Sequence, residues 1–195
     1  MLDKKTTDET LIKKAADGDR AAFLLIYESH RVVIYRFALQ MLGNNQQAED
    51  VTHDCFLSLM KQPQKFNPRT GSLRTYLFGA ARNLALKHFR DSSGSLSLVD
   101  LKVEPKARKD QSPLNKLVED ETTEKVQSAI AALPVLQREA LILFEYQEMS
   151  LAEIAAIVES EIGTVKSRLY RAREQLRKTL SPYFKSGLDI AAAEK

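Results

Sequence analysis

The stretch that decides the fold is residues 150–178, SLAEIAAIVESEIGTVKSRLYRAREQLRK. Its apolar residues recur with the period of an α-helix, first from Leu151 to Val158 and again from Val165 to Leu176. The turn VESEIG separates the two patterns, and the second pattern is far more basic than the first. A short helix, a tight turn and a basic helix with polar first turns are typical of a helix-turn-helix that reads DNA.

The positive charge of the second helix is one-sided. From residue 163 to 178 the only acid is Glu174, against the cations Lys166, Arg168, Arg171, Arg173, Arg177 and Lys178. Such a helix can also be a solvated face or lie on a membrane. A solvated helix usually mixes both signs, and a membrane helix is disfavoured because the apolar face has no Trp or Phe and has a preceding helix to pack on. The pattern therefore favours DNA as the partner.

Composition places the chain among folded intracellular proteins. Its 195 residues are 44% hydrophobic and 28% charged, which suits one domain or two small ones. Because the net charge of the whole chain is only +3, the positive electrostatic potential is expected to be local rather than spread over the protein. A single cysteine, Cys55, excludes an internal disulfide framework and a cysteine-based zinc site. No stretch is long and apolar enough to span a membrane, and the N-terminus is not that of a signal peptide, so we expect a cytoplasmic protein.

Helical periodicity without strand-like alternation predicts an all-α protein. Before residue 150, helices are expected over about 8–17, 20–42, 46–61, 72–90, 119–132 and 134–145, with Gly43 and Asn44 ending the second. Residues 91–119 have no sustained period and are predicted to be a flexible linker. We therefore expect two small helical domains on a tether. The C-terminal one should be a four-helix, winged-helix-like helix-turn-helix domain.

Three segments, taken together, resemble one protein family. Residues 133–177, LPVLQREALILFEYQEMSLAEIAAIVESEIGTVKSRLYRAREQLR, resemble the C-terminal DNA-binding domain of bacterial extracytoplasmic-function (ECF) sigma factors of the sigma-70 family. Residues 48–57, AEDVTHDCFL, and 71–90, GSLRTYLFGAARNLALKHFR, are similar to the N-terminal domain of that family.

The resemblance implies that different segments of the chain have different functions. Residues 1–90 would be the region 2 domain, which binds core RNA polymerase and the −10 element, and 120–183 the region 4 domain, which reads the −35 element. Residues 91–119 would link them, and 184–195 would be a tail. It implies no catalytic residue, cofactor or metal, because the polymerase supplies the chemistry. An anti-sigma factor is a further possible partner, although no residue identifies one.

An acidic patch is expected on the helix at 46–61. Glu49, Asp50, His53 and Asp54 are spaced to share one outer face, which suits a basic protein surface or simply solvent. The resemblance implies that this face binds the coiled coil of the largest polymerase subunit. His53 stands where the family usually has Gln.

The helix at 72–90 combines cations with aromatic rings, a pattern suited to single-stranded DNA. The resemblance implies contacts with the melting −10 element by Arg74, Thr75, Tyr76, Arg82, Asn83, Lys87 and Arg90. Phe78 and Phe89 are expected in the core instead. A flipped base would need a pocket, which we expect within residues 65–72.

The first turns of the recognition helix should enter the major groove. The residues implied to meet the −35 element are Thr164, Lys166, Ser167, Arg168, Tyr170, Arg171 and Arg173. Lys166 and Arg171 suit guanine edges, while Arg168 and Arg173 lie off that face and suit phosphates. Glu159, in the turn, occupies a position where the family often has Gly, and Glu is disfavoured where the backbone is left-handed.

Two other classes of protein compete with this interpretation. A response regulator could share the C-terminal domain, but it would carry an α/β receiver, and the N-terminal half has no strand-like runs rich in Val and Ile. An enzyme could use His53 with its acidic neighbours as a metal site. However, the three histidines, His30, His53 and His88, complete no metal shell, and no phosphate loop or nucleophile motif is present.

Overall fold

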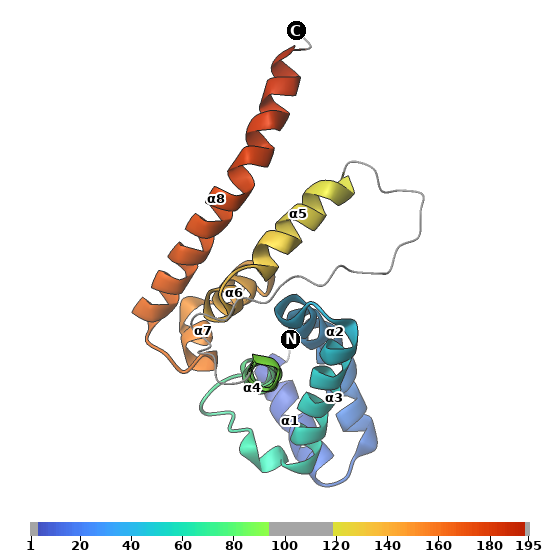
Figure 1. The fold of residues 1–195 in the computed structure, drawn as a ribbon. Coiled ribbons are helices and arrows are strands. Elements are labelled where there is room, and N and C mark those ends of the chain that lie inside the picture. Colours follow the sequence, from blue (N-terminus) through green and yellow to red (C-terminus); the bar gives the residue numbers. More distant parts are fainter. Residues whose placement is uncertain (1–3, 94–118, 194–195) are drawn as a thin grey trace.

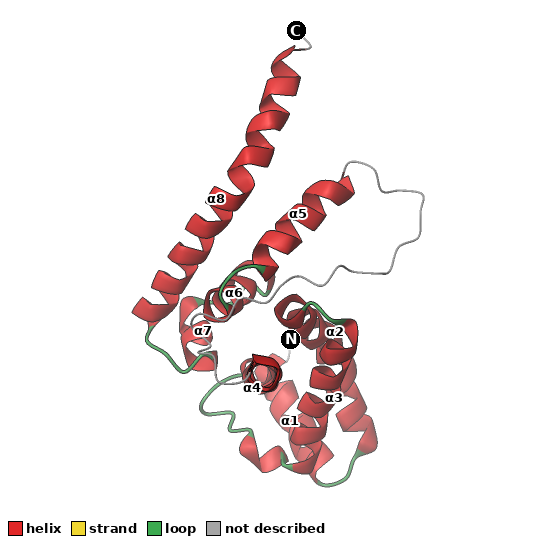
Figure 2. Cartoon of the chain, viewed as in Figure 1, coloured by secondary structure: helices red, strands yellow, loops and turns green. Residues whose placement is uncertain are grey.

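The computed structural model describes residues 4–93 and 119–193, in which helices are joined by loops and turns and no strand is present (Figures 1 and 2). The N-terminal region, residues 4–93, contains α1 (Lys4–Ala16), α2 (Arg20–Leu42), α3 (Asn45–Lys61), the 3-10 turn η1 (Pro63–Lys65) and α4 (Leu73–Ser93). The C-terminal region, residues 119–193, contains α5 (Glu119–Ala131), α6 (Val135–Leu141), the π-helical turn η2 (Ile142–Tyr146), α7 (Leu151–Ile157) and α8 (Ile162–Ala193). The expected all-α class is confirmed.

Local capping explains the sharp corner between α2 and α3. Gly43 ends α2 with a φ of 66°, and its amide donates to the carbonyl of Leu39 at 2.8 Å. Asn44 then caps α3, because its side-chain oxygen accepts a hydrogen bond from the Gln47 amide at 2.9 Å. The predicted stop at these two residues is confirmed.

The core of the N-terminal region lies between α2, α3 and α4 and combines aliphatic side chains with aromatic rings. The Phe37 and Phe78 rings meet edge to face with centroids 5.3 Å apart. Phe78 is fully buried and Phe89 is 4% exposed, so the expectation that both belong to the core is confirmed. Cys55 is also buried in this core, and its thiol donates to the carbonyl of Leu77 at 3.5 Å.

Several predicted boundaries need correction. The first helix begins at Lys4 rather than at 8, and α4 runs to Ser93, three residues into the predicted linker. The rest of that linker, 94–118, lies outside the described residues. The predicted single helix over 134–145 is wrong, because α6 ends at Leu141 and a π-helical turn follows. In that turn the Gln147 amide donates to the carbonyl of Ile142, five residues earlier, at 3.1 Å.

The two regions pack against each other. One continuous cluster of buried apolar side chains extends from α2, α3 and α4 into α6, η2, α7 and α8. Figure 1 shows α6 and α7 placed between α4 and the long α8, and contacts join α4 to α7 and α2 to η2. The sequence predicted two helical units, but periodicity offered no sign of this contact between them.

Candidate nucleic-acid interface

A capping box fixes the start of α7, the first helix of the helix-turn-helix. The Ser150 hydroxyl oxygen accepts a hydrogen bond from the Glu153 amide at 3.2 Å, and the Glu153 carboxylate accepts from the Ser150 amide at 2.9 Å. The carboxylate also accepts from the Ser150 hydroxyl at 2.7 Å. These hydrogen bonds from Ser150, the hydroxyl first, lower the pKa of Glu153.

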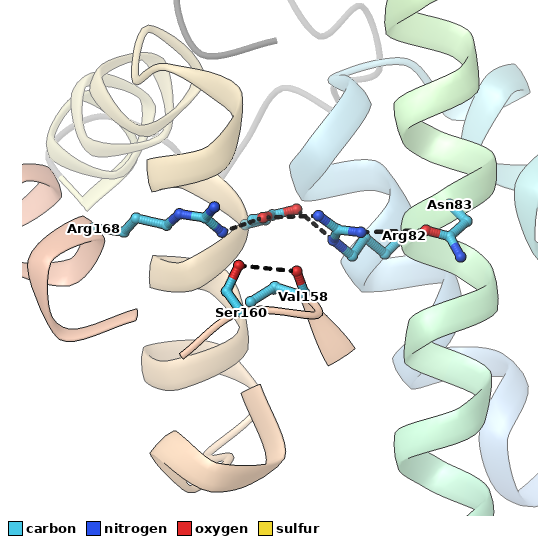
Figure 3. A network of polar contacts seen from close by, with 6 residues as sticks. Arg82, Asn83, Val158, Ser160 and Arg168 are labelled. Atoms are coloured by element: carbon cyan, nitrogen blue, oxygen red, sulfur yellow. Dashed lines mark hydrogen bonds and ion pairs between the residues drawn. The ribbon is translucent and has the colours of Figure 1, made fainter. Parts of the chain in front are cut away.

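The turn after α7 has the left-handed residue for which glycine is the usual choice. Glu159 has a φ of 52°. The Ser160 amide closes the turn by donating to the carbonyl of Ala155 at 3.1 Å, and the Ser160 hydroxyl donates to the carbonyl of Val158 at 3.3 Å (Figure 3). The chain thus makes the tight helix-turn-helix bend at the cost of one strained glutamate.

The first turns of α8 present a polar face opposite a buried stripe. Val165, Leu169 and Ala172 are buried against the rest of the C-terminal region. The side chains on the other face are exposed, and these are Thr164, Lys166, Ser167, Tyr170 and Arg171. Tyr170 is 69% exposed. This face is free to meet the edges of base pairs in a major groove.

The two remaining arginines predicted on α8 bind carboxylates of the same region. Arg173 donates to Glu145 of η2 at 2.6 Å, and both side chains are about half exposed. Arg168 donates to Glu139 of α6 at 3.1 Å, where the carboxylate is fully buried. Their expected role at phosphates stays a prediction, and for Arg168 it requires release from a buried partner.

On α4, the predicted DNA-binding side chains divide into two groups. Asn83, Lys87 and Arg90 are exposed. Arg74 and Arg82 instead reach across to the C-terminal region. Arg74 donates to the carbonyl of Gln147 at 2.6 Å, and Arg82 binds Glu139 with nitrogen–oxygen distances of 2.8 and 3.3 Å.

Tyr76 and Thr75 begin α4 beside the loop in which we expect a base pocket. Tyr76 is half-buried, with its ring edge-on to Phe66 at 5.7 Å, and the Thr75 hydroxyl is 2.9 Å from that of Ser72. An apolar groove of about 390 Å³ lies where α1 faces this loop, lined in part by Ile12, Phe66 and Pro68. Part of the predicted pocket segment, 65–72, therefore borders an open groove.

The acidic patch on α3 lies on the surface, as its spacing indicates. Glu49, Asp50, His53 and Asp54 are all exposed. Gln46, one turn earlier, donates to Asp50 at 3.2 Å. The patch is accessible in this conformation of the chain.

Sequence reasoning missed two buried charges of α6, Arg138 and Glu139. Glu139 is completely buried and joins Arg82 and Arg168, which come from the two predicted DNA-binding helices (Figure 3). Burial raises the pKa of Glu139, and Arg82 and then Arg168 oppose that rise. The sequence did contain an indication that these two charges are buried, because Arg138 and Glu139 share a helical face with the apolar Val135 and Ile142.

Arg138 is a second link between the regions. Its guanidinium is 1% exposed and donates to the carbonyls of Met41 at 2.6 Å and Leu133 at 3.0 Å, and also to that of Ala131. Burial lowers the pKa of Arg138 to about 10. The carbonyls of Met41 and Ala131 lie in the last turns of α2 and α5, where helix dipoles place partial negative charge.

Within 4–93 and 119–193, no three His, Cys, Asp or Glu side chains gather closely enough to hold a metal ion. No helix in the same residues has the length and apolar character needed to cross a bilayer.

Comparison with known proteins identifies relatives of both regions. The family model described as Sigma-70 region 2 matches residues 26–94, and that described as Sigma-70, region 4 matches 123–176. The chain is 29% identical to RNA polymerase sigma-H factor of Pseudomonas aeruginosa, covering 90% of this chain and 94% of the relative. It is also 29% identical to ECF RNA polymerase sigma factor SigW of Bacillus subtilis, covering 87% and 94%.

Solved structures share the fold. The chain is similar to CnrH, solved in complex with the cytosolic domain of CnrY, with a TM-score of 0.68 and 22% identity over 90% of this chain and 98% of CnrH. It is also similar to the sigma factor RpoE of Bartonella quintana, solved with the anti-sigma factor NepR, with a TM-score of 0.62 and 24% identity over 82% and 96%.

Proposed function

Because this chain belongs to the extracytoplasmic-function sigma factors of the sigma-70 family, we propose that it binds core RNA polymerase and directs transcription initiation to particular promoters. Regions 2 and 4 follow each other in one chain, and the relatives match it over nearly their whole length. The response-regulator alternative is set aside, because residues 4–93 form helices and contain no strand of an α/β receiver.

The main support for this proposal is the exposed face of the first turns of α8. Lys166, Ser167, Tyr170 and Arg171 point away from the buried stripe of a capped helix-turn-helix. Lysine and arginine donate to the O6 and N7 acceptors of guanine, so this face can read a duplex sequence in the major groove. We assign to it the −35 element.

The N-terminal region would supply the other two contacts. On α4, Asn83, Lys87 and Arg90 offer an amide and two cations to a melted −10 strand. On α3, the acidic patch would dock on the polymerase. When both DNA-binding surfaces are held on one polymerase, binding of the first raises the effective concentration of the second at the promoter. Neither surface therefore needs a high affinity for DNA by itself.

This function needs no chemistry from the chain itself. The polymerase forms the phosphodiester bonds, so the proposed subunit contributes binding and no catalytic residue. It would work in the cytoplasm, where polymerase and chromosome meet. Family membership also makes an anti-sigma factor a proposed partner.

Reconstituted transcription tests the proposal. Core polymerase would transcribe sheared genomic DNA with and without the purified chain, and the 5′ ends of the transcripts would be mapped. We expect the chain to create a small set of new starts, each preceded by the same pair of spaced sequence elements. Identical start sites with and without the chain would refute it.

A further inference from the structure

We propose that Glu145 competes with DNA phosphates for Arg173, and that this competition limits how tightly α8 holds any duplex. The inference rests on the proposed function, because it concerns the duplex-binding surface assigned to α8. It adds to that surface a carboxylate of η2 that lowers the affinity for every DNA sequence alike. Discrimination between base pairs would stay with the exposed face of the first turns of α8.

Two neighbouring residues of η2 hold the guanidinium of Arg173. Its Nη2 and Nε atoms both donate to one oxygen of the Glu145 carboxylate, at 2.6 and 3.1 Å. The same guanidinium lies over the Phe144 ring, 5.2 Å from the ring centroid. Arg173 therefore has an anionic partner and an aromatic partner within the chain itself, and a phosphate has to displace the anionic one.

Exposure distinguishes this ion pair from the one between Arg168 and Glu139. The side chains of Arg173 and Glu145 are 54% and 43% exposed, so a phosphate oxygen can approach the guanidinium from solvent. An ion pair this exposed is weak, because water screens it. The Glu139 carboxylate is fully buried and Arg168 is 17% exposed, which suits a link between α6 and α8. Of the two arginines, Arg173 is thus the one that can readily exchange a carboxylate for a phosphate.

Arg173 lies at the edge of the DNA-facing side of α8, where a phosphate contact is expected. It follows Lys166 by two helical turns, so the two cations lie along one edge of that side. Lys166 and Arg171 are exposed and form no ion pair within residues 4–93 and 119–193. The chain thus leaves these two cations of α8 available to the duplex and occupies a third with its own carboxylate.

When Arg173 binds a phosphate, one ion pair replaces another. The gain in affinity is therefore smaller than for an unpaired arginine, and the released Glu145 carboxylate is left close to the negative DNA backbone. Because phosphates carry no base sequence, the loss of affinity is the same for every duplex. Weaker sequence-independent binding reduces retention of the chain on bulk DNA, and in the polymerase complex the effective concentration offsets it.

The affinity of the full-length chain for a duplex tests the competition between carboxylate and phosphate. Fluorescence anisotropy would follow binding to a labelled DNA duplex of random sequence at a series of salt concentrations. Glu145→Gln should bind the duplex about threefold more tightly at low salt, as expected when an exposed ion pair no longer has to be broken. The difference from the unsubstituted chain should shrink as the salt concentration rises, because salt screens that ion pair.

Two further substitutions separate the release of Arg173 from the general effect of removing a negative charge. Glu148→Gln, shortly after η2, removes an exposed carboxylate that forms no ion pair within the described residues, so it should tighten binding less than Glu145→Gln does. In a chain that also carries Arg173→Gln, Glu145→Gln should change the affinity no more than Glu148→Gln does, since no guanidinium is left to release. Circular dichroism would establish that each variant is helical.

Three outcomes of the binding series would overturn the competition. They are equal tightening by Glu145→Gln with and without Arg173, unchanged affinity of Glu145→Gln at low salt, and no duplex binding by any variant. Reconstituted transcription judges the proposed function separately. A chain that shows the expected coupling between Glu145 and Arg173 but creates no new transcription start would refute the proposed function, and the competition would still stand.

Discussion

The guanidinium of Arg138 donates a 2.6 Å hydrogen bond to the main-chain carbonyl of Met41, which joins α6 of the C-terminal region to the end of α2. The same guanidinium bonds to the carbonyls of Leu133 and Ala131. One buried cation thus satisfies carbonyl groups at the ends of two helices.

Replacing Arg138 should therefore destabilise the whole chain. Arg138→Met keeps much of the side-chain volume but leaves these buried carbonyls without donors, and we expect a loss of about 3 kcal/mol in the free energy of unfolding. Chemical denaturation followed by circular dichroism measures it. Arg36→Met, at an exposed arginine of α2, is the control and should change stability by less than about 0.5 kcal/mol. Equal effects of the two substitutions would contradict the assignment.

Glu159→Gly should stabilise the chain. The φ of 52° at this exposed residue is costly for any side chain with a Cβ, and glycine should recover about 1 kcal/mol. Glu159→Ala is the matched control, because it removes the same charge and keeps the Cβ. A rise in thermal midpoint for glycine without one for alanine is the expected result, and equal midpoints for the two variants would show that backbone strain is not the cause.

The capping box should make α7 sensitive to acid. The pKa of Glu153 lies below its ordinary 4.5, so its contribution is present above that value and is lost as pH falls through the lowered pKa. Ser150→Ala should cost about 1 kcal/mol at neutral pH. Denaturation at a series of pH values should show this difference shrinking below 4.5. A difference independent of pH would mean that the Glu153 charge takes no part.

Cys55 should be inert in the folded chain. Burial raises the pKa of its thiol to about 12, so the reactive thiolate is scarce at mildly alkaline pH. Because the folded state holds this proton more tightly, stability should fall as pH rises above the ordinary value of 9.0. A thiol reagent should modify Cys55 only as fast as the chain unfolds. It should modify the exposed cysteine introduced by Ser58→Cys immediately, in the folded chain. Equal rates at the two positions would contradict the burial.

The helix positions and the polar face of α8 were predictable because each leaves a periodic pattern in the sequence. The stripe Val165, Leu169 and Ala172 identifies the exposed side of α8 whatever else the chain does. The bond between Arg82 and Glu139 left no such pattern, since the two residues are 57 positions apart. The apolar face that Glu139 shares indicates that its side chain is buried, but it does not indicate which residue binds it. Periodicity identifies which face of a helix is polar, but it does not reveal whether another region covers that face.

The assignment of two promoter elements to two surfaces is tested most directly by pairing variants with base changes. Arg171→Ala and Asn83→Ala, both at exposed residues, would be assayed by reconstituted transcription on one mapped promoter with single substitutions in each element. We expect Arg171→Ala to lose discrimination only in the upstream element, by an amount worth about 1–3 kcal/mol per base pair, and Asn83→Ala only in the downstream element. If each variant weakened transcription uniformly, whichever base was changed, the account would be wrong.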